Sequence, residues 1–402
     1  MARHHAAFLW VLALAGASEP ALSAREVLDE AWWTGPLLAA SPATLPQGHM
    51  LVEPYFYDSV ADGVYDSGGA RHAIAHQNEY GSLTYVLYGL TDSATVGVIP
   101  KFGFNDPGYG QPGSGMGIGD LTIQGAYRLS RFLDQGWLPA LSLVIAETLP
   151  TGRYDHLAEL PSAGMGAGAY TTTVSVYSQY YLWLPNGRIL RTRLNVSQSW
   201  SARVGIEDVS VYGTTQGFRG HASPGDSVNI DSAWEYSVTR KWVAALDLAY
   251  VDSGSTRVMG EYLQLANGGG LSNSQSASGS SQSLSVAPAI EYNWSSTAGI
   301  IFGAKWVAAG RNTGAAVVPI IAINLVFLGI DDSTGGTGGA WHQGVVRNPI
   351  QFPTLAAIVR IRLLEMAGCC RYFRDHKFNQ DHARTQGLLI DELTAPVLEF
   401  TD

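Results

Sequence analysis

The sequence predicts an all-β protein, a transmembrane antiparallel up-and-down β-barrel of about twelve strands with a C-terminal tail outside the barrel. Three observations predict it. Apolar and polar residues alternate with a period of two along much of the segment 49–327. Short and long connections alternate between the predicted strands. Beyond the first 24 residues, no apolar run is long enough to form a membrane-spanning helix.

The composition agrees with this class and argues against others. Charged residues make up only 14% of the chain, whereas an average soluble domain has about a quarter. Glycine (46), tryptophan (11) and tyrosine (19) are abundant. The net charge of −10 argues against broad nucleic-acid binding, so no nucleic-acid partner is expected. The two cysteines, Cys369 and Cys370, are adjacent and cannot form a disulfide framework.

The first 24 residues have the pattern of a secretory signal peptide. Arg3 begins a weakly basic region, residues 6–17 are apolar, and small residues near Ala17 and Ala24 offer cleavage sites. We therefore exclude residues 1–24 from the fold. Residues 25–48 then form an N-terminal segment that is expected in the periplasm.

The strands follow from alternation in three clear examples. In GDLTIQGAYRL (119–129), Leu121, Ile123 and Tyr127 share one face, while polar residues occupy the other. SVNIDSAWEYSV (227–238) and SLSVAPAIEYNW (283–294) alternate in the same way. Because successive side chains of a strand point to opposite faces, each segment is a strand with one apolar and one polar face.

The same reasoning along the chain predicts twelve strands, which are separated alternately by tight turns and by longer connections. The predicted strands are 49–58, 80–89, 93–104, 118–130, 137–149, 169–184, 188–201, 228–239, 241–252, 283–294, 297–309 and 315–327. Asn186-Gly187 is the strongest hairpin signal among the tight turns. The longer connections are rich in Gly, Ser, Pro and Asp and lie at 59–79, 105–117, 150–168, 202–227 and 253–282; only 310–314 is short.

Alternating turn lengths are typical of bacterial outer-membrane barrels, which have tight periplasmic turns and longer external loops. Lipid offers no partner to backbone N–H and C=O groups, so a membrane protein built of strands must close into a ring. Aromatic residues near strand ends, among them Trp137, Trp183 and Trp242, suit the headgroup regions of the membrane. We therefore expect the protein in the bacterial outer membrane, with outer-membrane lipid as a partner.

The last predicted strand, 315–327, ends at Phe327, yet the chain continues to residue 402. A final strand of alternating apolar residues that ends in Phe resembles the signal read by the outer-membrane assembly machinery. We therefore predict that Phe327 ends the barrel and serves as this assembly signal. Residues 328–402 are richer in charge and show no strand rhythm. They form a small periplasmic appendage, a disordered extension, or a frame-shifted or read-through end.

Several stretches resemble the family "MetA-pathway of phenol degradation", outer-membrane transporters of proteobacteria. The matching stretches, which cover nearly all of 32–327, include WWTGPLLAASPATLPQGHMLVEPYFYD (32–58), GIGDLTIQGAYRL (117–129), TLPTGRYDHL (148–157), WLPNGRILRTRLNVSQSW (183–200) and the segment 208–251. The resemblance implies an outer-membrane channel, which the family name associates with the uptake of aromatic compounds. The chain departs from the family pattern in its tail after Phe327.

The polar faces of the strands predict the lining of the barrel interior. The candidate lining residues are Lys101, Asp120, Arg128, Arg191, Arg193, Asp231, Glu235, Asp247, Glu291 and Lys305. Two roles are open for them. Arginine–carboxylate pairs can satisfy polar groups and rigidify the barrel, or opposed charges can form a constriction that selects solutes. Arg191 and Arg193, on one strand opposite Asp231 and Glu235, are the candidates for such a constriction.

The predicted function is passive uptake of small solutes, hydrophobic or aromatic ones among them. A barrel enzyme that acts on lipids is an alternative, but the histidines are scattered and no GxSxG motif accompanies them. A structural or adhesive surface protein is another, supported by the external loops, although 267–283 has the composition of a flexible linker. No catalytic residue, cofactor or metal site is predicted; the expected partners are lipid, the assembly machinery and a small-molecule solute.

Overall fold

The computed structural model describes residues 25–108, 114–133, 136–158, 161–264 and 270–329. All of them belong to one compact unit, Met1–Gly344. The predicted signal peptide (1–24) and the tail beyond residue 329 lie outside the described residues. Among the described residues, no helix is long and apolar enough to cross a membrane.

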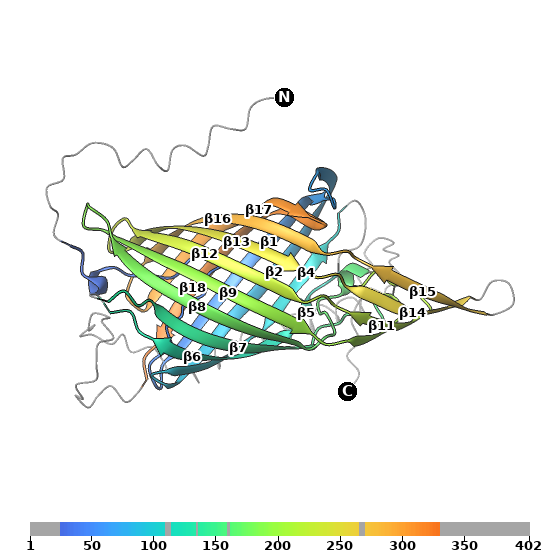
Figure 1. The fold of residues 1–402 in the computed structure, drawn as a ribbon, viewed down its shortest axis with the longest axis horizontal. Coiled ribbons are helices and arrows are strands. Elements are labelled where there is room, and N and C mark those ends of the chain that lie inside the picture. Colours follow the sequence, from blue (N-terminus) through green and yellow to red (C-terminus); the bar gives the residue numbers. More distant parts are fainter. Residues whose placement is uncertain (1–24, 109–113, 134–135, 159–160, 265–269, 330–402) are drawn as a thin grey trace, which may run out of the picture. The chain divides into compact units, whose positions relative to one another are not determined.

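The predicted fold class is confirmed: the main sheet closes into an antiparallel barrel of twelve strands (Figure 1). In chain order its elements are β1 (Met50–Tyr65), β2 (Arg71–Thr91), β3 (Ala94–Ile99), β4 (Lys101–Asp106), β5 (Gly117–Ile118), β6 (Leu121–Ser130), β7 (Ala140–Leu149), β8 (Thr171–Trp183), β9 (Ile189–Ser201), β12 (Ser227–Ser237), β13 (Trp242–Ser253), β16 (Ser281–Asn293), β17 (Ala298–Arg311) and β18 (Thr313–Phe327). β3 and β4 both pair with β2 and form one barrel strand, and β5 leads into β6. β1 pairs with β18 from Met50↔Phe327 to Tyr65↔Thr313, which closes the ring.

The five tight turns predicted from the sequence all lie at one end of the barrel, together with the first residue of β1 and the last residue of β18. At the β8–β9 turn, Gly187 has a φ of 80°, and its N–H donates to the carbonyl of Leu184. A side chain rarely adopts this left-handed conformation, which explains the Asn-Gly pair. We call this end the periplasmic end, because outer-membrane barrels place their tight turns there.

One of the expected long connections at the other, outer end is much shorter than predicted, and the connection predicted to be short, 310–314, is short. β1 and β2 continue far past 58 and 80, so that only residues 66–70 connect them rather than 59–79. Residues 62–79 have the polar composition of a loop because both faces of these strand ends are exposed to water. The alternation of apolar and polar residues disappears where neither face of a strand is apolar. β17 and β18 are joined by Asn312 alone.

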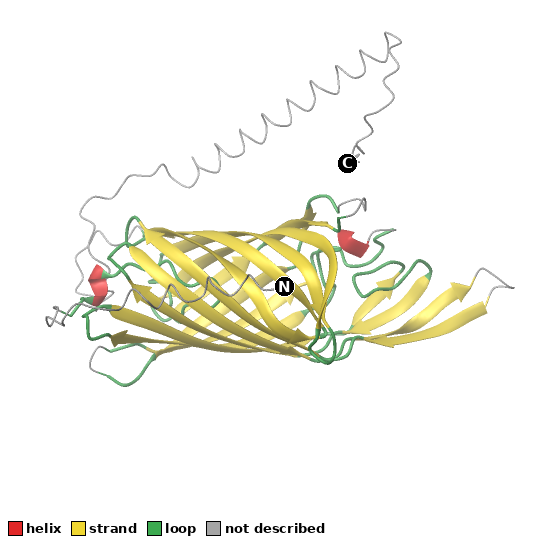
Figure 2. Cartoon of the chain, turned by 90° about the horizontal axis from the view of Figure 1, so that it is seen from above, coloured by secondary structure: helices red, strands yellow, loops and turns green. Residues whose placement is uncertain are grey.

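The segments predicted as loops at 202–227 and 253–282 contain a second, four-stranded sheet. It is formed by β10 (Val204–Glu207), β11 (Phe218–Ser223), β14 (Arg257–Gln264) and β15 (Gly270–Ala277), in the order β10-β11-β14-β15. The sheet extends beyond the outer end of the barrel (Figures 1 and 2). The expectation of a flexible linker at 267–283 is therefore wrong for 270–277, which pairs in register with β14 from Arg257↔Ala277.

The two faces of the barrel strands differ as the alternation predicts. Large apolar side chains are exposed on the outside; Phe56, Val196, Ile290 and Phe302 are between 43% and 52% exposed. The residues between them point inward, and many are buried although they are polar or charged. An apolar outer band around a closed barrel is the surface that lipid requires. The protein is an outer-membrane β-barrel.

Candidate functional site: the barrel interior

Residues 25–48, which we call the inner segment, run along the inside of the periplasmic half of the barrel. After the short 3-10 helix η2 (Leu28–Glu30), the segment forms no regular structure. Its backbone groups therefore need partners, because unpaired buried N–H and C=O groups are costly. Many of the partners are inward-pointing side chains of the strands, and others are backbone groups, such as the carbonyl of Arg240 that accepts from Trp32 N–H.

Glu26 fixes the start of the inner segment at the periplasmic end of β8, β9 and β12. Its carboxylate forms an ion pair with Arg188 (3.1 Å) and accepts a hydrogen bond from Ser237 Oγ (2.5 Å). Its carbonyl accepts a hydrogen bond from Trp183 Nε1 (2.8 Å). Arg25 lies over the same Trp183 ring, 3.7 Å from its centroid.

Glu291 of β16 fixes the next turn of the segment. Its Oε2 accepts hydrogen bonds from the backbone N–H groups of Thr34 (2.7 Å) and Gly35 (3.2 Å). Asn293, two residues farther along β16, accepts from the Thr34 hydroxyl (2.9 Å) and donates to the carbonyl of Trp32 (3.2 Å). Gly35 has a φ of 124°, so glycine is needed where the chain turns between these two side chains.

Asp247 of β13 binds three consecutive backbone N–H groups. They belong to Leu37, Leu38 and Ala39, at 3.1, 3.2 and 3.0 Å. The Asp247 side chain is completely buried. A carboxylate away from water is tolerable when hydrogen bonds replace its hydration, and these three donors do so.

Arg193 and Asn195 of β9 bind the carbonyl side of the same stretch. Arg193 Nη1 donates to the carbonyl of Ala39 (2.7 Å), and Asn195 Nδ2 donates to that of Ala40 (2.9 Å). Asp247 and these two side chains therefore fix both the donors and the acceptors of residues 37–40.

Glu235 of β12 connects the two arginines. It forms a two-pronged ion pair with Arg191, through Nε–Oε2 at 2.6 Å and Nη2–Oε1, and lies 3.4 Å from Arg193 Nε. Arg193 Nε also donates to Gln179 Oε1 (2.9 Å), and Arg191 lies over the Trp33 ring at 4.4 Å. The register places Arg191 directly opposite Glu235, so the strand pairing aligns the ion pair.

Small inward residues leave room for the segment against the wall. Leu37 packs on a cluster of buried side chains from neighbouring strands, namely Ala245, Ala287, Ala289, Ile301 and Ala322. Larger side chains at these positions would fill the space that Leu37 occupies. The segment is thus held by apolar contact as well as by hydrogen bonds.

The inner segment then crosses the interior to the turn between β2 and β3. The Thr44 hydroxyl donates to the carbonyl of Asp92 (2.7 Å), and Leu45 N–H donates to Thr95 Oγ1 (2.8 Å). Gly89 of β2 lies under Pro46, whose carbonyl would collide with any added Cβ at that position. β3 and β9 are separated by β6, β7 and β8 in the barrel, so the segment spans from one wall to another.

The structure therefore brings five of the ten candidate lining residues together: Arg191, Arg193, Glu235, Asp247 and Glu291. All five are at most 6% exposed. The other five lie elsewhere on the inner face. Arg128 is near the periplasmic end of β6, and Asp231 and Lys305 are nearer the middle of β12 and β17.

Asp120 and Lys101 lie toward the outer end. Asp120 accepts hydrogen bonds from the N–H groups of Gly152 (2.9 Å) and Ala167 (2.7 Å), so it fixes the loop between β7 and β8. Lys101 begins β4, and its carbonyl accepts from Gly119 N–H (2.9 Å).

Tyrosines and polar side chains line the interior beyond the buried ion pairs. Tyr55 of β1 and Tyr85 of β2 meet edge to face, with ring centroids 5.8 Å apart. Tyr177 of β8 is in register with Asn195, which in turn is in register with Asp231. The interior is therefore amphipathic at this level, with aromatic rings beside hydrogen-bonding groups.

The outer end is covered by two loops that bind each other. Leu157 N–H donates to the Val209 carbonyl (3.0 Å), and Val211 N–H donates to the Tyr154 carbonyl (2.9 Å). Tyr212 Oη donates to the Ala167 carbonyl (2.5 Å), and burial, with a smaller effect of the Asp120 charge, raises the pKa of Tyr212 to about 12. The phenol therefore stays protonated as a donor.

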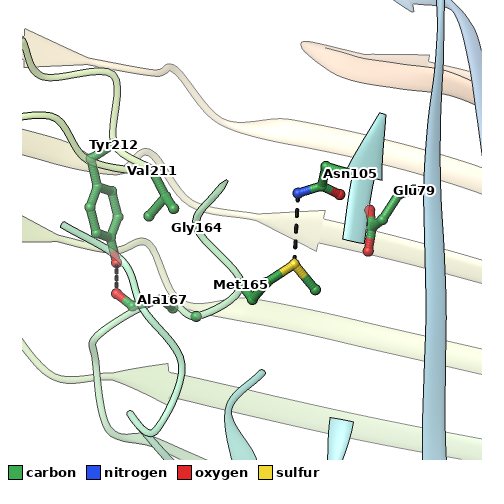
Figure 3. A pocket seen from close by; sticks show the side chains of 8 residues that line it. Glu79, Asn105, Gly164, Met165, Ala167, Val211 and Tyr212 are labelled. Carbon is green, nitrogen blue, oxygen red and sulfur yellow. Dashed lines mark hydrogen bonds between the residues drawn. The ribbon is translucent and has the colours of Figure 1, made fainter. Parts of the chain in front are cut away.

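A cavity of about 340 Å³ lies beside these loops (Figure 3). It is lined by Glu79, Asn105, Gly164, Met165, Gly166, Ala167, Val211 and Tyr212. Asn105 Nδ2 donates to the Ser162 carbonyl (2.7 Å) and lies 3.8 Å from the Met165 sulfur, so it fixes the loop at the cavity wall. The cavity is an outer vestibule of mixed polarity.

No family model matches the chain, and no curated protein matches its sequence. Among solved structures, an outer-membrane channel from Pseudomonas putida F1 matches with a TM-score of 0.56 and 15% identity, over 72% of this chain and 100% of that one. The toluene transporters TbuX of Ralstonia pickettii and TodX of Pseudomonas putida match with TM-scores of 0.32 and 0.31, at 10% and 11% identity, over 71% of this chain and 90% and 92% of theirs. The first likeness is one of fold, and the other two are too distant to support an inference.

Sequence reasoning missed the inner segment and the neutral residues that bind it, such as Asn195 and Asn293. Two features of the sequence could have indicated that a segment lies inside the barrel. Ala245, Ala287 and Ala289 are small residues on inward faces, where a filled barrel needs large ones. Gly89 sits inside a strand, which often marks a close approach of another backbone.

Proposed function

We propose that the protein is a passive outer-membrane channel for small solutes, hydrophobic or aromatic ones among them. The observation that supports this proposal best is the amphipathic interior between the inner segment and the outer loops. Tyr55 and Tyr85 meet edge to face there, and Tyr177 and Asp231 are both in register with Asn195. Rings with polar edges suit a solute that has an apolar body and one or two polar groups.

We also propose kinship with the phenol-degradation transporters that the sequence motifs resemble. The proposal rests on those motifs and on the twelve-stranded barrel that contains them. Outer-membrane lipid and the assembly machinery are the proposed partners, with Phe327, the last residue of β18, as the assembly signal.

Liposome swelling tests the channel directly. Liposomes with the purified protein should swell in phenols and small aromatic acids faster than protein-free liposomes do. Equal rates with and without protein for every solute tested would refute the proposal.

A pair of variants tests the role of the interior rings. Changing both Tyr85 and Tyr177 to Ala should lower the swelling rate in phenols relative to that in small sugars. The matched control is Tyr127→Ala, because Tyr127 points to lipid and is 57% exposed. An unchanged ratio in the double variant would mean that the tyrosines do not select the solute.

A further inference from the structure

Among the described residues, five buried charges of the periplasmic half take part in fixing the chain. Glu235 pairs with Arg191 and Arg193, and Asp247 and Glu291 accept backbone hydrogen bonds from the inner segment. Opposite charges at this range cancel much of each other's field, and water does not reach them. The Arg191–Glu235 pair therefore presents little net charge to a passing solute.

The inner segment itself lies in the path of a solute. Its residues 37–40 are bound to β13 and β9, and Thr44 and Leu45 are bound at the β2–β3 turn. The stretch between these contacts leads from the β9 side of the interior to the β3 side, and its Pro42 is almost completely buried. A solute that moves along the barrel has to pass beside this crossing.

Burial shows which side of the crossing faces open space. Ala39, Pro42 and Thr44 are buried, and Pro42 and Thr44 are almost completely so, whereas Ser41 and Ala43 are exposed. Ser41 follows Ala40, which is bound to Asn195 in the same register row as Tyr177 and Asp231. Ser41 is therefore placed next to the tyrosine-lined part of the interior.

We propose that residues 41–43 form the constriction of the pore, which selects solutes by size, and that the buried charges serve to fix this constriction rather than to select ions. This inference rests on the proposed channel function. Small side chains at Ser41 and Ala43 set the free width. Changing their size should change conductance, whatever the charge of the added group.

Thiol modification tests the proposal on the full chain. Ser41→Cys and, separately, Ala43→Cys are made in a background where Cys369 and Cys370 are replaced by Ser. Single channels in planar bilayers are then treated with a cationic or an anionic methanethiosulfonate of similar size. Either reagent should lower conductance by about half or more, because the added bulk narrows the pore.

The control is Ala277→Cys, an exposed residue of β15 outside the barrel, which should react without a change in conductance. If Ser41→Cys and Ala43→Cys are modified, as mass spectrometry would show, and conductance stays the same, the constriction lies elsewhere. If the cationic and anionic reagents act in opposite directions, charge and not size selects. Absence of conductance from the unmodified protein would instead refute the channel function itself.

Discussion

The two halves of the barrel interior are narrowed by different means. In the periplasmic half, one continuous segment from the N-terminal side is bound by buried carboxylates, arginines and amides of the strands. At the outer end, two loops cover the opening mainly through backbone hydrogen bonds to each other and through Asp120 and Tyr212. The periplasmic half therefore depends on buried charges that cannot lose their partners, whereas the outer half depends mostly on backbone hydrogen bonds, which a change of side chain leaves in place. Substitution of the binding side chains should therefore cost more stability in the periplasmic half than in the outer loops.

The largest expected effect is that of Glu235→Ala. It leaves the Arg191 and Arg193 guanidinium groups buried without a carboxylate, which costs about 3–5 kcal/mol of folding free energy. Urea unfolding in lipid vesicles, followed by tryptophan fluorescence, would measure it. Glu261→Ala on β14 is the control, because Glu261 is exposed and surface changes are usually within about 0.5 kcal/mol. If the two variants were equally stable, the periplasmic half would be no more sensitive to substitution than the outer sheet.

Asp247→Ala should have the next largest effect, because the N–H groups of Leu37, Leu38 and Ala39 lose their acceptor. We expect a loss of about 2–3 kcal/mol, and roughly half of that for Asp247→Asn, which keeps one acceptor oxygen. Protease cleavage within residues 33–45 in the folded barrel should rise in the same order. Wild-type resistance to cleavage in Asp247→Ala would mean that Asp247 does not fix the inner segment.

Two glycines of the barrel sharpen the comparison between its inner and outer faces. Gly89→Ala places a methyl group against the Pro46 carbonyl and should cost about 1–3 kcal/mol through overpacking. Gly125→Ala adds the same methyl group on the lipid face, where no atom lies within 4 Å. It should be neutral or stabilise by up to about 0.5–1 kcal/mol, because glycine weakens strands. The urea midpoint of Gly89→Ala should fall, whereas that of Gly125→Ala should rise or stay unchanged.

The smallest effect is expected at the outer loops and depends on pH. Asp155 hydrogen-bonds His156 and raises the pKa of His156 above its ordinary value; Glu207 lies 3.4 Å from its Nε2. Because the pKa of His156 is raised in the folded state, its contact with Asp155 stabilises the loop fully below about pH 6.5. This stabilisation is lost as the pH rises through the folded-state pKa of His156. Hydrogen exchange at residues 154–158, corrected for intrinsic rates, should therefore be faster at pH 8 than at pH 6. His156→Gln should abolish the difference, and its persistence there would exclude His156 as the cause.

The strands were the most predictable part, because one face of each has to meet lipid. β9 and β13 begin and end within one residue of their predicted bounds, since alternation continues to the tight turns. β1 and β2 were predicted too short, because their outer ends are wet on both faces and carry no alternation. The hairpin of β14 and β15 was missed for a related reason: β15 consists mostly of Ser, Asn, Gln and Gly and has the composition of a linker.

The candidate site was predictable in its residue types but not in its partners. Alternation placed Arg191, Glu235 and Asp247 inside, since charged residues cannot face hydrocarbon. It did not show that Asp247 binds backbone N–H groups about two hundred residues earlier in the chain. The inner segment has no periodic alternation of apolar and polar residues. Its local sequence therefore does not show which strands it contacts.

The sequence by itself determined that the chain closes into a barrel and which side chains face inward, because lipid leaves an unpaired backbone no other solution. Only the tertiary structure decided what those inward charges do. Closure brings strands far apart in the chain to one wall, and residues 25–48 then occupy part of the space between the walls. The position of this segment determines whether a buried carboxylate binds an arginine, a backbone N–H group or a solute.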